Sequence, residues 1–391
     1  MKKILVLSAL LCAFVSAMAE EEKTDAYIPP VEPEVQATID HWQDLKFGLF
    51  IHWGIYSQLG CVESWSLVPG DLDWQMRSRR ERGMDYFEYL KFYEQTKTTF
   101  NPLAFDPSKW AAAAKYAGMK YVVFTTKHHD GFCLWPNPVS EHTVAQSSWR
   151  NGQGDVLREL SDACRKADLK FGVYISPWDR NAPTYGSPAY NETFLATLQS
   201  ALTQYGPIYE QWFDGANGEG PNGKKQVYDW PAFNGQVYKL QPNAVIFSDV
   251  GPGCRWMGNE EGWAGRTCWS TMNLEDAEGN RYQPGTGVPS QSILNTGEAD
   301  GKYWVPAETD VSIRPGWFWR KSEHPKSLQQ LLSIYYTSVG RNSLLLLNVP
   351  PDTRGLIDAE DSVRLMEFRA ALDTIFAHDI VLEAQHLKLR L

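Results

Sequence analysis

Hydrophobic residues gather in short continuous runs along the chain, and most of these runs end in polar or glycine residues. Such runs predict parallel strands buried on both faces, because a strand with one face in solvent would alternate apolar and polar positions. Eight segments fit: KFGLFIHWG (46–54), YVVFTTKHHDG (121–131), KFGVYISPWD (170–179), YEQWFDGAN (209–217), AVIFSDVG (244–251), RTCWSTMN (266–273), PGWFWR (315–320) and NSLLLLNVPP (342–351).

Between several of these runs the apolar positions take the spacing of an amphipathic helix. We predict helices over 107–118, 154–168, 190–206 and 326–340. Alternating helices and about eight strands favour a (β/α)8-like barrel over a doubly wound sheet, and no G-x-G-x-x-G follows the first strand. The stretch from 274 to 311 has few strand or helix signals, so we expect loops over the cleft there.

Polar and aromatic residues follow the first five predicted strands, whereas the strand starts are apolar. In a barrel of this kind the active site lies at the carboxyl ends of the strands. The pattern therefore predicts a site built from His52-Trp53-Gly54, Lys127-His128-His129-Asp130, Ser176-Pro177-Trp178-Asp179, Trp212-Phe213-Asp214-Gly215 and Ser248-Asp249.

Carboxyl groups at these strand ends suggest glycoside hydrolysis, which needs two carboxyls at one sugar ring, roughly 5–5.5 Å apart in a retaining enzyme. Asp214 is the leading nucleophile, and Gly215 would let backbone or sugar approach closely. Asp-Gly is also a common turn pair, so a turn or helix-cap role is the alternative. For the acid/base, the loop 255–265 offers Glu260 and Glu261, which the pattern does not separate and which would otherwise form a solvated turn.

The histidines of the His128-His129-Asp130 segment raise the question of a metal site. Consecutive strand residues point to opposite faces, so both rings could bind one ion only if the pleat breaks. No further His or Cys has ligand spacing, and no G-x-S-x-G or phosphate-cradling loop occurs. We therefore expect no metal and no cofactor, and we expect His52, His128 and His129 to bind sugar hydroxyls.

The first 19 residues predict a secretory signal peptide, with Lys2 and Lys3, a short apolar core and an Ala17-Met18-Ala19 cleavage site. Leu11 before Cys12 disfavours a lipoprotein, and the apolar run is too short to span a membrane. Cleavage would change the net charge from −10 to −12. We expect an exported protein, periplasmic or extracellular, that does not bind nucleic acid or insert into a membrane. The sequence says nothing of the oligomeric state.

The 16 Trp and 18 Tyr residues fill a large core, line a cleft that stacks on sugar rings, or do both. Their positions at strand ends favour the cleft for several of them. Five Cys follow the signal peptide, an odd number without metal-type spacing, and we expect mostly free, buried thiols.

Together these segments resemble the α-L-fucosidases of glycoside hydrolase family 29, from about Phe47 to about Ile375. The motifs that carry the resemblance are KFGLFIHWGIYS, TTKHHDGFCLW, YISPWD, YEQWFDGANG, CRWMGNEEG, VPAETDVSIRPGWFW and VGRNSLLLLNVPPD. The resemblance implies a retaining double displacement on a distorted (β/α)8 barrel, with Asp214 as nucleophile. It implies that the three histidines hold fucose hydroxyls and that Trp65, Tyr174 and Trp212 line the fucose pocket.

The RW-x-G-x-E-x-G pattern resembles the branch specific for α-1,3/1,4-linked fucose, found in Lewis-type oligosaccharides. It places the acid/base at Glu260 rather than Glu261, and SIRPGWFW puts Trp317 or Trp319 near the sugar. A broad-specificity fucosidase, a hydrolase of another sugar and a non-catalytic fucose-binding barrel are the alternatives.

The resemblance also bears on the domain organisation. Members of this branch usually continue into a C-terminal β-sandwich, which is expected to be absent or truncated here because only LDTIFAHDIVLEAQHLKLRL follows the last barrel helix. We expect a signal peptide (1–19), an exposed lead-in (20–36), a catalytic domain (37–375) and a tail (376–391).

Overall fold

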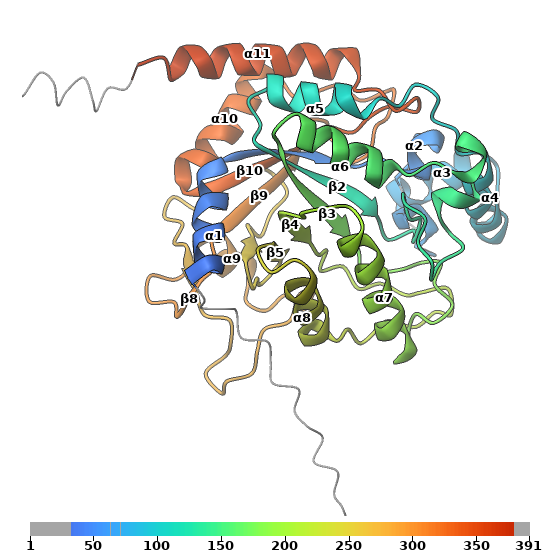
Figure 1. Cartoon of the computed structure of the whole chain (residues 1–391), viewed down its shortest axis with the longest axis horizontal. Coiled ribbons are helices and arrows are strands. Elements are labelled where there is room, and N and C mark those ends of the chain that lie inside the picture. The colour runs from blue at the N-terminus through green and yellow to red at the C-terminus, as the bar shows by residue number, and fades with distance from the viewer. Residues whose placement is uncertain (1–32, 63, 71, 379–391) are drawn as a thin grey trace, which may run out of the picture.

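The computed structural model describes residues 33–62, 64–70 and 72–378, so the predicted signal peptide lies outside the described residues (Figure 1). Eight parallel strands close into a barrel in the order β1-β10-β9-β6-β5-β4-β3-β2. The predicted (β/α)8 barrel is confirmed. Its strands are β1 (Phe47–Ile51), β2 (Tyr121–Lys127), β3 (Lys170–Ile175), β4 (Glu210–Trp212), β5 (Val245–Ser248), β6 (Cys254–Trp256), β9 (Ala307–Ser312) and β10 (Ser343–Asn348).

Two of the eight predicted strands are wrong. Within 266–273, only β7 (Thr271–Met272) is a strand, and it pairs antiparallel with β8 (Tyr303–Trp304) outside the barrel. Residues 315–320 form an irregular segment after β9. The sixth and seventh barrel strands are β6 and β9, which lie in segments expected to be loops. Their apolar runs are interrupted by the buried charged residues Arg255, Glu308 and Asp310, which hide the strand signal.

All four predicted helices are confirmed as α5 (Pro107–Tyr116), α6 (Val156–Lys166), α7 (Ala189–Thr203) and α10 (Leu328–Ser338). Three begin at caps legible in the sequence, since Asp106, Asp155 and Ser327 each accept a backbone N–H of the first turn. The remaining helices are α1 (Pro33–Leu45), α2 (Ile55–Leu59), α3 (Asp73–Glu81), α4 (Tyr86–Thr99), α8 (Trp230–Leu240), α9 (Gln291–Thr296) and α11 (Ala359–Ile375).

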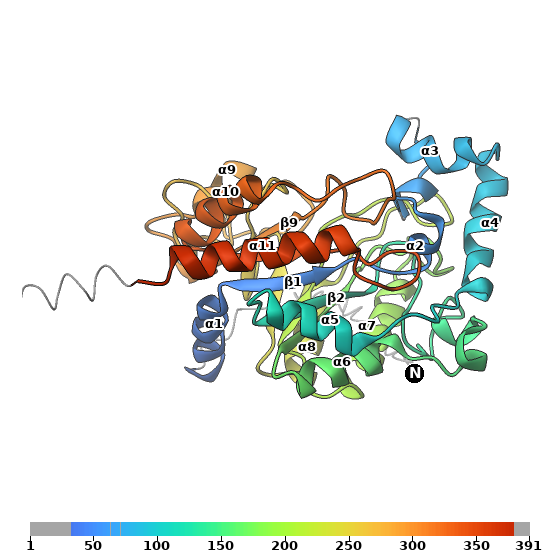
Figure 2. The ribbon, with the colours of Figure 1, turned by 90° about the horizontal axis from the view of Figure 1, so that it is seen from above.

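The two ends of the barrel are covered differently. Figure 2 shows α1 at the end where β1 starts and α2, α3 and α4 at the end where it finishes. Trp42 of α1 is fully buried, and its Nε1 donates to Glu210 Oε2 at 3.1 Å. Helix α1 therefore closes the amino-terminal end of the barrel, and the long β1–β2 connection leaves the carboxyl end available for a site.

Two carboxyl groups, Glu210 and Glu308, are buried inside the barrel. Tyr121 Oη donates to Glu308 at 2.7 Å, and Trp212 Nε1 donates to it at 3.0 Å. Burial raises the pKa of Glu308 to about 7, and burial together with neighbouring Glu308 raises the pKa of Glu210 well above its usual range. Glu308 thus holds the indole of Trp212 in place from inside the barrel, through the hydrogen bond from Nε1.

This buried pair predicts a pH-dependent stability. A carboxyl whose pKa is raised by folding ionises first in the unfolded chain, so the protein loses stability as pH rises above about 4.5. Glu210→Gln removes one of these ionisations and keeps an acceptor for Trp42. We expect the variant to gain about 2 °C or more in melting temperature at pH 8 relative to the parent, and less at pH 5. Thermal melts across this range test it, and an equal change at both pH values would contradict it.

Among residues 33–62, 64–70 and 72–378, no helix is long and apolar enough to cross a membrane. The five cysteines at 61, 133, 164, 254 and 268 are buried and free, as expected.

Candidate active site

A cavity of about 480 Å³ opens at the carboxyl end of the barrel. Its lining brings together residues from β1, β2, β3, β4, β6 and β9 or from the loops that follow them. The nine residues given a catalytic or sugar-binding role line it: His52, Trp65, His128, His129, Tyr174, Trp212, Asp214, Glu260 and Trp317. Other residues of the predicted strand-end segments do not line it, among them Lys127, Asp130, Asp179, Ser248 and Asp249. Their side chains are contributed by segments up to 265 residues apart in the chain, which only barrel closure brings into one place.

Asp214 follows β4 and is held on both carboxylate oxygens. Tyr174 Oη donates to Oδ2 at 2.9 Å, and the backbone N–H of Ala216 donates to Oδ1 at 2.7 Å. The hydrogen bond from Ala216 is the one expected if Asp214 had the role of a turn residue, which was the alternative to a catalytic role. Asp214 therefore closes a turn and also faces the cavity. Burial raises its pKa, while the Ala216 N–H, His128 and Tyr174 oppose that rise.

The residue after Asp214 is Gly215, and the neighbouring Asp249 side chain leaves no space there for a Cβ atom. A Cβ at this position would come within 2.4 Å of an Asp249 carboxylate oxygen. That carboxylate accepts the N–H of Gly285 at 2.8 Å, which ties the 274–290 loop to the end of β5. The close approach predicted for Gly215 is therefore made by Asp249 and this loop.

The pleat of β2 does break before the two histidines. The register with β3 shifts between Thr125 and Lys127, the strand ends at Lys127, and the His128 and His129 rings lie 4.2 Å apart on the same cavity. The expectation that His128 and His129 point to opposite faces of the strand, which argued against their binding one metal ion, therefore does not hold here. Among the residues that the structure describes, no group of three or more His, Cys, Asp or Glu is arranged to hold a metal.

All three site histidines are buried, and burial is the main reason that their pKa values fall. The pKa of His128 falls to about 3, and those of His52 and His129 lie well below their usual range. Each ring is therefore neutral at neutral pH and offers one N–H donor and one acceptor, the combination that a sugar hydroxyl matches. His52 Nδ1 lies 3.0 Å from Asn348 Oδ1, and His129 Nδ1 lies 2.6 Å from Ser176 Oγ.

Glu260 and Glu261 occupy different environments. Glu260 lines the cavity, and Trp317 Nε1 donates to its Oε2 at 3.0 Å. Glu261 instead accepts from Nε1 of the exposed Trp263 at 2.8 Å and is not part of the cavity lining. Of the two tryptophans expected near the sugar, Trp317 lines the cavity, whereas Trp319 donates to Asp358 away from it.

The comparisons with known proteins agree with this geometry. The family model described as Alpha-L-fucosidase matches residues 14–373. The chain belongs to this α-L-fucosidase family.

Among relatives, Alpha-L-fucosidase 1 of Arabidopsis thaliana is 47% identical over 286 residues, covering 73% of this chain and 55% of the relative. Putative alpha-L-fucosidase 1 of Oryza sativa is 48% identical over the same length, covering 73% and 53%. The chain thus spans about half the length of these curated relatives.

Solved structures show the same fold. A glycoside hydrolase 29 family member from an unknown rumen bacterium superposes with a TM-score of 0.71 at 40% identity, over 85% of this chain and 56% of that one. A putative alpha-L-fucosidase from Bacteroides ovatus gives a TM-score of 0.70 at 40% identity, over 90% and 59%. The resemblance to family 29 seen in the motifs is confirmed.

The sequence did not reveal two carboxyl groups that line this fucosidase-family cavity, those of Asp310 and Glu323. Asp310 of β9 lines the cavity at 3% exposure, and its Oδ1 is buried without a hydrogen-bond partner among the described residues. Burial, with Glu260 nearby, raises its pKa well above the usual range. Glu308 and Asp310 are two positions apart, so both point into the barrel; this alternation in AETDVS was the signal that could have revealed them.

Proposed function

We propose that this chain removes terminal α-L-fucose from glycans by a retaining mechanism. The observation that carries the proposal is that Asp214 and Glu260, which follow β4 and β6 with β5 between them, face one cavity lined by neutral histidines and aromatic rings. Membership of the α-L-fucosidase family indicates that the sugar is fucose, and Asp214 and Glu260 are the two carboxyl groups that glycoside hydrolysis needs. A fucose-binding barrel without activity would have no use for both of them.

In the first step an Asp214 carboxylate oxygen attacks the anomeric carbon of fucose, and the bond from that carbon to the glycosidic oxygen breaks. Glu260 gives its proton to the leaving oxygen. In the second step Glu260 takes a proton from water, the water oxygen bonds to the anomeric carbon, and the bond to Asp214 breaks. The hydrogen bonds from Tyr174 and Ala216 favour the ionised form of Asp214 that the attack requires.

The remaining lining suits a deoxy sugar. His52, His128 and His129 exchange hydrogen bonds with ring hydroxyls, and the unpaired oxygen of Asp310 gives a further polar contact. Trp65, Tyr174, Trp212 and Trp317 supply apolar faces for the C–H groups and the methyl of fucose.

We propose α-1,3/1,4-linked fucose of Lewis-type branched oligosaccharides as the substrate. Support comes from the RWMGNEEG and SIRPGWFW segments, which put Glu260 and Trp317 in contact at the cavity. A comparison of a Lewis-type trisaccharide, fucose α-1,2-linked to galactose and 4-nitrophenyl α-L-fucoside tests this. We expect fast release from the Lewis substrate alone; similar rates on all three would instead favour a broad-specificity fucosidase.

The contact between Trp317 and Glu260 yields a prediction about positioning. Trp317→Phe keeps an aromatic ring but removes the N–H that holds Glu260. We expect roughly a tenfold loss in kcat on an oligosaccharide with little change in KM. Trp319→Phe, which removes a similar bond outside the cavity, is the matched control. Equal losses in both variants would argue that the effect is structural.

We also propose that the protein is exported, on the strength of the signal sequence in residues 1–19. Amino-terminal sequencing of protein from its native host should begin at Glu20, and a mature chain that retains Met1 would contradict export by cleavage.

A further inference from the structure

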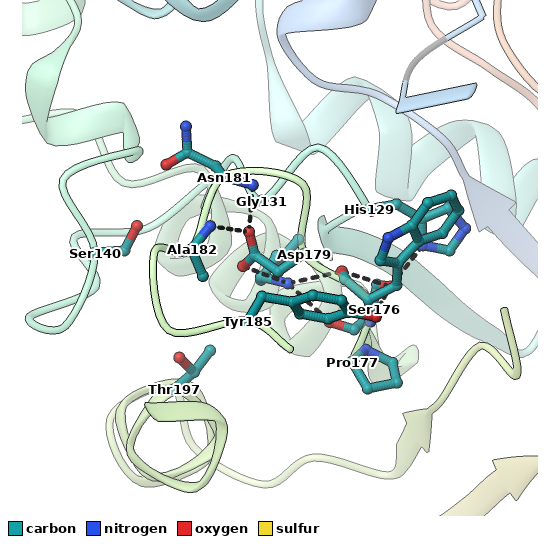
Figure 3. A network of polar contacts seen from close by, with 12 residues as sticks. His129, Gly131, Ser140, Ser176, Pro177, Asp179, Asn181, Ala182, Tyr185 and Thr197 are labelled. Carbon is teal, nitrogen blue, oxygen red and sulfur yellow. Dashed lines mark hydrogen bonds and ion pairs between the residues drawn. The ribbon is translucent and has the colours of Figure 1, made fainter. Parts of the chain in front are cut away.

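A second cavity, of about 710 Å³, lies beside the catalytic one and shares no lining residue with it. We call it the α4 cavity, because it lies between α4, α7 and the loops 137–142 and 179–184. Figure 3 shows Ser140, Thr197, Ala182 and Asp179, which line it, approaching from these different segments. Its volume falls within the range of roughly 300–1,000 Å³ that is typical of small-molecule sites.

One wall of the cavity is a layer of ion-paired and hydrogen-bonded groups. Lys127 Nζ lies 3.0 Å from an Asp179 carboxylate oxygen and also donates to the Ser176 carbonyl at 2.8 Å. Asp179 further accepts the N–H groups of Asn181 and Ala182. On the far side of this layer, Ser176 Oγ contacts His129 of the catalytic cavity (Figure 3). The two cavities are therefore back to back, with a hydrogen-bonded wall between them.

His142 is the feature of the α4 cavity that points to a ligand. Its side chain is 2% exposed, and its Nδ1 is buried without a hydrogen-bond partner within the described part of the chain. Burial lowers its pKa to about 3, so the ring is neutral. Buried polar atoms are nearly always paired in folded proteins, and an unpaired one lining a cavity suits a hydroxyl that arrives with a ligand. Arg180 Nε, also in the lining, is a second unpaired buried atom.

The rest of the lining indicates the class of ligand. Carboxylates outnumber cations in it, which disfavours an anion such as phosphate. Ser140, Thr193 and Thr197 bring hydroxyls, and Tyr86 and Phe87 of α4 bring aromatic rings. Phe87 is 71% exposed, so one face of its ring is open to solvent. Neutral polar groups beside an uncovered aromatic face match a sugar ring, which presents hydroxyls at its edge and C–H groups on its face.

We propose that the α4 cavity is a second saccharide-binding site, which takes a neutral hexose or N-acetylhexosamine residue. The sugar ring stacks on Phe87, and one of its hydroxyls pairs with His142 Nδ1. This site is separate from fucose hydrolysis, since its lining includes none of the residues of the catalytic cavity.

Calorimetric titration of the whole protein with N-acetyllactosamine tests the proposal, with L-fucose present at saturation to occupy the catalytic cavity. We expect saturable binding to the parent and at least tenfold weaker binding to Phe87→Ala and to His142→Phe. Tyr116→Ala removes a comparably exposed aromatic residue from α5, outside both cavities, and should bind like the parent.

Phe87→Ala changes only a surface residue, so it keeps the test informative if His142→Phe fails to fold. Absence of saturable binding to the parent would overturn the proposal. So would parent-like binding by Phe87→Ala, or loss of binding in Trp65→Ala, which alters the catalytic cavity alone. A crystal soaked with the disaccharide should show it between α4 and the 137–142 loop. Electron density for the disaccharide only in the catalytic cavity would also contradict the proposal.

Discussion

Asp214→Ala should lower the turnover of 4-nitrophenyl α-L-fucoside by about 10⁴-fold or more, because it removes the carboxylate that we propose forms the bond to the anomeric carbon. The neutral histidines and aromatic rings remain, so L-fucose should still bind, as calorimetry would show. Added azide should restore part of the turnover by attacking the anomeric carbon in place of Asp214 and yielding β-L-fucosyl azide. That product would also support the retaining assignment.

Asp249→Asn is the matched control for this variant. Its carboxylate lies next to Gly215, but it accepts the Gly285 N–H and is not part of the cavity lining. We expect it to keep activity within about tenfold of the parent, since the amide oxygen can still accept that bond. Near-normal activity in Asp214→Ala, or an equal loss in Asp249→Asn, would remove Asp214 from the nucleophile role.

Glu260→Gln should reduce hydrolysis of a fucosylated oligosaccharide by about 10²- to 10⁴-fold, the usual range for loss of a positioned acid or base. The amide keeps an acceptor for Trp317 but has no proton to give to the leaving oxygen. Formation of the fucosyl-enzyme from an aryl fucoside with a good leaving group should suffer far less, because that oxygen leaves without protonation. Burst kinetics on 4-nitrophenyl α-L-fucoside separate the two steps.

Glu261→Gln is the control on the adjacent residue, because its side chain contacts Trp263 at the surface. We expect parent-like rates on both substrates. If Glu261→Gln instead showed the substrate-dependent loss, the acid/base role would pass to Glu261.

Much of the fold was predictable because six barrel strands are buried on both faces and therefore read as continuous apolar runs. The four predicted helices could be recognised from their apolar spacing; three of them, α5, α6 and α10, begin at side-chain caps, and three, α5, α7 and α10, are followed by a glycine. Strands β6 and β9 were missed because Arg255, Glu308 and Asp310 are buried polar residues with partners or roles inside the fold. Conversely, the aromatic residues in 266–273 and 315–320 have the pattern of a buried strand, but neither segment forms a barrel strand. The second segment instead places Trp317 and Phe318 at the cavity.

By itself the sequence determined the barrel, the family motifs and the end of the barrel where polar residues gather, because these depend on local periodicity and order along the chain. Only the tertiary structure decided which of two adjacent glutamates faces the cavity, that both histidines lie on one side of a broken pleat, and that Asp310 joins them. Those features depend on contacts between segments that are far apart in the chain, such as the 57 residues between Glu260 and Trp317. Their geometry follows from closure of the barrel, and no local pattern carries that information.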